Sequence, residues 1–168
     1  MNQFRRTIRL VAALTLSFPV LLSVAQTNGP AQPFRAGATA VDITPWMGLS
    51  INGNMTDHKG TNVHDPLHAR ALVLDDGKTR LAIVVADSCM IYREIFDAAK
   101  KLVQERTGLP TENILMAATH THSAAAAVSI FQSEAEKEYQ HFLTLRLADA
   151  VQQAMNDLAP AQIGWGAT

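Results

Sequence analysis

Two histidines near the middle of the chain have the residue type and spacing that a metal site or an acid/base site requires. They lie in the segment Ala118-Thr119-His120-Thr121-His122-Ser123, directly after the apolar run Ile114-Leu115-Met116-Ala117. That run predicts a buried strand, and because successive strand side chains alternate between faces, His120 and His122 are expected to point the same way. Two imidazoles on one side of a strand end form half of a metal site or of an acid/base site.

Metal binding is the chemistry that this spacing favours. Neutral imidazole is a good zinc ligand, and a catalytic zinc ion has about three protein ligands with one position left for water. That water has a pKa near ~7 and is a usable nucleophile. Thr119, Thr121 and Ser123 give the histidines polar surroundings that core packing does not require. The alternative is that the histidines only donate hydrogen bonds to backbone carbonyls beneath a loop.

Asp87 is a further candidate, because it ends the strongly apolar run Leu81–Ala86. Its carboxylate is expected either to hold the second nitrogen of a histidine or to cap the turn before the next helix. One hypothesis is therefore a complete metal site made of His120, His122 and Asp87.

The remaining titratable candidates carry weaker signals. His64 and His68 are four residues apart, but Pro66 argues against a helix between them, so a solvated strand entry is the expectation. Cys89 is the single cysteine of the chain, which excludes an intramolecular disulfide. It is expected to be a buried core residue rather than a nucleophile.

The elements that must position these residues predict an α/β domain with a mixed sheet layered with helices. The Asp-Gly step at residues 75–78 predicts a hairpin, and the apolar run over 81–86 predicts a strand covered on both faces. The expected order is β-ββ-α-β-α-β, incomplete at the C-terminus. Strands are expected over 34–44, 67–74, 80–86, 113–118 and from 161 onward, and helices over 91–107 and 134–158. Residues 46–62 form a long loop of the kind that carries function.

The amino terminus has the pattern of a secretory signal peptide. Three arginines in residues 1–9 precede the apolar stretch 10–24 and the cleavage site Ser23-Val24-Ala25. Residues 26–33 form a lead-in and residues 34–168 the domain. An uncleaved membrane anchor is the alternative. Removing residues 1–25 changes the formal net charge from −1 to −4, which gives no electrostatic reason to bind nucleic acid.

Several segments together resemble the neutral/alkaline (non-lysosomal) ceramidase family. They are Gly37-Ala38-Thr39-Ala40-Val41-Asp42-Ile43-Thr44-Pro45, His68-Ala69-Arg70-Ala71-Leu72-Val73-Leu74, the apolar strand ending in Asp87 and, most specifically, the histidine motif over 118–123. The resemblance implies an exported zinc-dependent amidohydrolase that cleaves the N-acyl bond of ceramide or a related lipid amide. It makes His120 a zinc ligand and His122 a catalytic residue beside the reacting centre.

The resemblance covers only the N-terminal part of that family's catalytic domain. The family's further histidine, glutamate and tyrosine ligands come from later segments, and residues 161–168 resemble a strand that has just begun. The 168-residue chain is therefore expected to be an N-terminal fragment or a truncated member, inactive on its own. A non-catalytic exported binding domain that uses the same pocket is the alternative function.

One departure from the family pattern concerns the substrate. The family motif usually continues with Gly-Pro-Gly, whereas this chain has Ala124-Ala125-Ala126-Ala127. Glycines allow close approach of backbone to a ligand, so the alanines argue against specificity for long-chain ceramide, and another amide or a related ester is the expected substrate. Such a lipid substrate also implies peripheral contact with a membrane.

Export gives the first testable prediction. A secreted or periplasmic product whose first residue is Gln26 is expected, because the small residues Ser23 and Ala25 suit signal-peptide cleavage after Ala25. Amino-terminal sequencing of the exported protein checks the position. A mature chain that still begins at Met1 would favour the uncleaved anchor.

Overall fold

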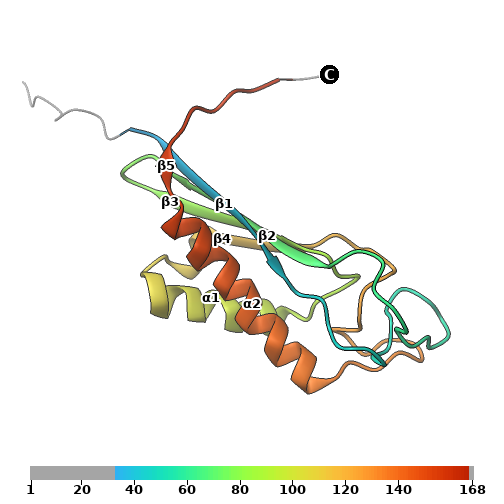
Figure 1. Cartoon of the computed structure of the whole chain (residues 1–168). Helices are drawn as coiled ribbons and strands as arrows, with labels where there is room; N and C mark the ends of the chain where they lie inside the picture. Colours follow the sequence, from blue (N-terminus) through green and yellow to red (C-terminus); the bar gives the residue numbers. More distant parts are fainter. Residues whose placement is uncertain (1–32, 167–168) are drawn as a thin grey trace, which may run out of the picture. The chain divides into compact units, whose positions relative to one another are not determined.

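The computed structural model describes residues 33–166, which form an α/β domain with one mixed five-stranded sheet and two helices (Figure 1). The signal peptide expected over residues 1–25 lies outside the described residues, as does the lead-in up to residue 32. The strands are β1 (Arg35–Asp42), β2 (His68–Asp75), β3 (Arg80–Ala86), β4 (Ile114–Ala118) and β5 (Ala159–Pro160), and the helices are α1 (Arg93–Thr107) and α2 (Lys137–Asn156), with a 3-10 turn over Thr111–Asn113.

The sheet has the order β4-β3-β2-β1-β5 and combines antiparallel and parallel pairs. β1 pairs antiparallel with β2, and β2 forms the predicted hairpin with β3. Gly77 adopts φ 84° in the hairpin turn. The buried Asp75 carboxylate accepts hydrogen bonds from Arg80, from the Gly77 amide and from Arg35, which lower its pKa to about 2. β3 and β4 run parallel, connected through α1.

Both helices pack on the same side of the sheet (Figure 1). α2 contributes the apolar stripe that its sequence predicts, including the fully buried Tyr139, Leu143 and Leu147. The predicted coverage of β3 on both faces is wrong, because no described helix lies on the second face. The exposed large apolar side chains of that open sheet face are Leu72, Leu81, Ile83, Val85 and Leu115.

Helix α2 and the last strand differ from the expected bounds. α2 runs from Lys137 to Asn156 instead of over 134–158, and β5 begins at Ala159 and consists of two residues paired with β1. The strand expected from residue 161 is therefore misplaced, and residues 161–166 carry no strand. Gly37 allows this arrangement, because a Cβ there would clash with the carbonyl oxygen of Ala154 at the end of α2.

α1 ends, as predicted, with Gly108 in the left-handed conformation (φ 75°). Neither described helix has the length and apolar character that crossing a membrane demands.

Candidate metal centre

The parallel pairing of β3 and β4 continues past both strand ends and brings two loops together. The amide of Thr119 donates to the carbonyl of Ala86, and the amide of His120 donates to the carbonyl of Ser88, each at 2.9 Å. Residues that follow β3 and residues that follow β4 are therefore neighbours. Cys89 Sγ consequently lies 3.8 Å from His120 Nδ1.

The backbone and ring of His120 are both held in a specific conformation. Its φ of 65° is in the left-handed region, which costs a non-glycine residue roughly 1–2 kcal/mol. Nδ1 lies 2.9 Å from the carbonyl oxygen of Cys89. Because a carbonyl oxygen only accepts, Nδ1 carries the proton in this hydrogen bond. Nε2 therefore keeps its lone pair available to bind a metal ion.

His122 lies beside His120 and is held from the other side by the long loop. The two ring centres are 5.0 Å apart with the planes at 75°. Gly53 has φ +108°, and a Cβ at this position would overlap Cγ of His122, so only glycine fits against the ring. The neighbouring Asn52 is fully buried and anchors the loop, since its side-chain amide donates to Val128 O and Ser133 Oγ.

These groups suit a metal ion. Cys89, His120 and His122 each offer one ligand atom, and the three atoms lie within 4.8 Å of one another. Two imidazoles on one tetrahedral ion have ring centres about 5 Å apart, because each nitrogen lies about 2.0–2.1 Å from the ion. Both histidines are exposed and Cys89 is buried, so an ion would reach the cluster from the histidine side.

The sequence predicted that the two histidines meet, but for a reason that the structure changes. β4 ends at Ala118, so the histidines lie on a loop, and the left-handed turn at His120 rather than strand alternation sets their orientation. Cys89 was missed as a member of the group. Its signal was available, since it follows β3 at nearly the same offset at which His120 follows the parallel neighbour β4.

The other sequence candidates lie outside the cluster. Asp87 Oδ2 accepts from the amide of His68 (3.0 Å) and from Nη1 of Arg70 (2.7 Å). It therefore neither holds a histidine ring nor caps α1, and the site of His120, His122 and Asp87 is not formed. His64 is exposed and pairs with Asp65 at 2.7 Å, as expected for a solvated strand entry.

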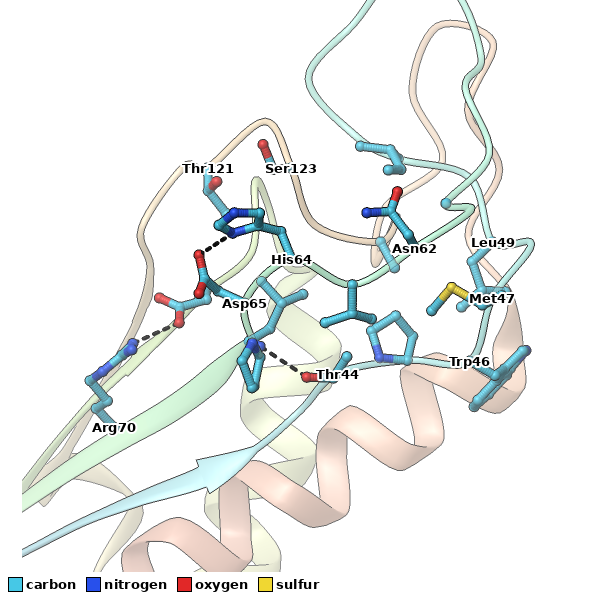
Figure 2. A pocket seen from close by; sticks show the side chains of 18 residues that line it. Thr44, Trp46, Met47, Leu49, Asn62, His64, Asp65, Arg70, Thr121 and Ser123 are labelled. Atoms are coloured by element: carbon cyan, nitrogen blue, oxygen red, sulfur yellow. Dashed lines mark hydrogen bonds and ion pairs between the residues drawn. The ribbon is translucent and has the colours of Figure 1, made fainter.

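A cavity of about 670 Å³ adjoins the histidine loop (Figure 2). Thr121 and Ser123 line it, whereas His120 and His122 do not. The segment after β4 therefore presents alternate residues to the cavity and to the cluster. Trp46, Met47 and Leu49 line one end of the cavity, and His64, Asp65 and Arg70 lie toward the other (Figure 2).

The four alanines that follow Ser123 are buried and fix the long loop against the histidine segment. The amide of Ala126 donates to Ser50 O at 2.7 Å, and the amide of Asn52 donates to Ala124 O at 3.1 Å. Ala125 also lines the cavity. Their small side chains allow this backbone pairing, and the methyl group of Ala125 makes this part of the wall apolar.

Comparison with known proteins adds the following similarities. Residues 34–168 match the family described as neutral/alkaline non-lysosomal ceramidase, N-terminal. Neutral ceramidase B of Dictyostelium discoideum is 30% identical over 149 residues, covering 76% of this chain and 20% of that protein. Neutral ceramidase A of the same organism is 36% identical over 91 residues, covering 51% of this chain and 12% of that protein.

Solved structures with a similar fold include two ceramidases. The neutral ceramidase of Pseudomonas aeruginosa has a TM-score of 0.70 at 24% identity, and a ceramidase complexed with C2 has a TM-score of 0.67 at 23% identity. Each match covers 76% of this chain and 22% of the solved chain. The chain thus spans about a fifth of the length of the relatives that it matches.

The contact between Gly53 and His122 gives a prediction with a matched control. Gly53→Ala is expected to displace the His122 ring, because the added methyl would overlap it. Gly48→Ala in the same loop also places alanine at a positive φ (+89°), but it meets no atom within 4 Å. Both variants should lose roughly 1 kcal/mol of unfolding free energy from backbone strain, and only Gly53→Ala should lose more.

Imidazole NMR signals provide the direct readout. The signals of His122 should shift in Gly53→Ala and stay in place in Gly48→Ala. Equal shifts in the two variants would show that Gly53 does not seat the ring.

Proposed function

Because the chain belongs to the neutral/alkaline non-lysosomal ceramidase family, we propose that it is the N-terminal portion of an exported zinc-dependent amidohydrolase. The proposed reaction is hydrolysis of the N-acyl amide bond of ceramide or a related lipid amide. The family match over residues 34–168 carries the proposal, and the imidazole pair after β4 supports it. Export rests on the sequence of residues 1–25.

His120 is the proposed zinc ligand. The hydrogen bond from its Nδ1 to the carbonyl of Cys89 fixes the tautomer and ring orientation and directs the lone pair of Nε2 outward. Zinc, when bound, supplies Lewis-acid activation of water, whose pKa falls to near ~7. The strained backbone at His120 is consistent with a functional position, because such strain persists where the surrounding structure fixes it.

His122 is the proposed catalytic residue beside the zinc ligand. Its ring, held between His120 and Gly53, would donate a hydrogen bond to the oxyanion that develops on the acyl carbonyl, or transfer a proton to the leaving amine. Both roles need a fixed ring, which the contact with Gly53 supplies.

The cavity beside the histidine loop is the proposed substrate site. Its apolar end, with Trp46, Met47 and Leu49, suits part of an acyl chain, and its polar end suits an amide and head group. Thr121 and Ser123 offer hydroxyl groups at the boundary with the histidine segment. A substrate in this cavity would therefore lie next to the loop that carries His120 and His122.

Substitution of His120 tests the proposed activity. In the longer enzyme, His120→Ala is expected to remove zinc and to slow ceramide hydrolysis roughly a hundredfold or more, because the water is no longer activated. Metal analysis and released fatty acid are the two measurements. His141→Ala, at an exposed histidine of α2, is the control and should change neither.

Three results would count against this assignment. Full zinc content and full rate in His120→Ala would exclude His120 as the ligand. Zinc loss with an unchanged rate would exclude zinc as the activator. Substrate binding without hydrolysis in the unsubstituted enzyme would favour the binding-domain alternative.

A charge in the cavity tests the substrate assignment. Met47 and Met55 are both exposed methionines of the long loop, but only Met47 lines the cavity. Met47→Lys should lower kcat/KM for a long-chain lipid amide by roughly tenfold, since about 1.4 kcal/mol of apolar contact is lost. Met55→Lys should leave it unchanged. Equal effects of the two variants would place the acyl chain elsewhere.

A further inference from the structure

We propose that the ion pair between Arg70 and Asp87 selects the head group of the substrate, favouring uncharged, hydroxyl-bearing head groups over head groups that carry a carboxylate. The inference rests on the proposed function, because it takes the cavity beside the histidine loop as the substrate site. It adds two specificity-determining residues at the polar end of that cavity. N-acyl amino alcohols are therefore expected to be better substrates than N-acyl amino acids.

The pairing of β2 with β3 places both side chains at the cavity wall. Arg70 lies opposite Val85 in the antiparallel register, and the ladder continues past β3, since the amide of Asp87 donates to the carbonyl of His68 at 2.9 Å. Asp87 Oδ2 accepts from the amide of His68 at 3.0 Å and from Nη1 of Arg70 at 2.7 Å. Main chain and side chain thus hold the carboxylate, which in turn holds the guanidinium of Arg70 at the wall (Figure 2).

The two charged side chains differ in their exposure to a ligand. The side chain of Asp87 is 18% exposed and that of Arg70 is 54% exposed. A guanidinium carries five N–H donors, and the hydrogen bond to Asp87 engages Nη1. Arg70 therefore presents further donors to the cavity, and the hydroxyl or carbonyl oxygen of a head group accepts such hydrogen bonds without carrying a charge.

The balance of charge at this end of the cavity disfavours an anionic ligand. Among the described residues that line it, Arg70 is positive, Asp65 and Asp87 are negative and His64 is neutral in its unprotonated form, a formal sum of 1 − 2 = −1. Asp65 and His64 are both largely exposed, so water screens their charges. The less exposed Asp87 neutralises Arg70 and repels a carboxylate that approaches the same guanidinium.

Two lipid amides that differ in one group test the selection. N-lauroylethanolamine and N-lauroylglycine share the acyl chain and the amide, and they differ in a hydroxymethyl group against a carboxylate. The measured quantity is the ratio of kcat/KM for N-lauroylglycine to kcat/KM for N-lauroylethanolamine, with the longer enzyme. Asp87→Asn keeps an acceptor oxygen for Arg70 but removes the negative charge, so this ratio should rise roughly fivefold.

Arg70→Gln is expected to change the ratio in the opposite direction, roughly fivefold downward, because the carboxylate of Asp87 is left without its partner. The double variant should return the ratio close to that of the unsubstituted enzyme, since neither charge of the pair remains. Asp97→Asn is the control, because Asp97 pairs with Arg93 on α1 at 3.1 Å and does not line the cavity. Partial loss of folding or of zinc lowers both rates together and leaves the ratio unchanged.

The outcomes separate this inference from the proposed activity. An unchanged ratio in Asp87→Asn and Arg70→Gln, with hydrolysis intact, would overturn the pair as a selector and leave the amidohydrolase assignment standing. A ratio that falls in both single variants would also overturn it, since the charge of Asp87 would then not exclude the acid. If neither probe is hydrolysed, calorimetric titration gives the ratio of their dissociation constants, and an unchanged ratio in Asp87→Asn overturns the selection. The metal content of His120→Ala decides the zinc assignment independently.

Discussion

The parallel alignment of β3 with β4 is the constraint on which the rest of the candidate site depends. Two main-chain hydrogen bonds extend this alignment past Ala86 and Ala118, so the two loops leave the sheet side by side. In α/β sheets such carboxyl ends of parallel strands are where ligands collect. Without this pairing, Cys89 and His120 would be separated along the chain by helix α1 and would not meet.

Within the loop after β4, successive residues face two different surroundings. Alternate residues face different surroundings: Thr121 and Ser123 line the cavity, and His120 and His122 face the buried thiol. The left-handed backbone at His120 turns the ring toward Cys89, and Gly53 closes the other side against His122. Residues that line the cavity and residues of the candidate metal cluster thus alternate along one short segment.

Features encoded by neighbouring residues were predictable from the sequence. The Asp-Gly hairpin, the Gly108 helix end, the strand before the histidines and the α/β fold all follow from local pattern, and the family resemblance is confirmed by the match over residues 34–168. Features set by distant partners were not. The position of Cys89 in the cluster depends on which strand lies beside β4. The Asp87 carboxylate instead accepts a hydrogen bond from Arg70 of the neighbouring strand β2. The assignment of His120 to zinc and of His122 to catalysis stays a prediction.

The open sheet face has a thermodynamic consequence. Among residues 33–166, the large apolar side chains of β2, β3 and β4 on that face are already 37–60% exposed in the folded state. Unfolding therefore hydrates less new apolar surface than it would in a domain whose sheet is covered on both sides. Because newly hydrated apolar surface is the main source of the heat-capacity increase on unfolding, the described domain has a flatter dependence of stability on temperature than its length alone would suggest.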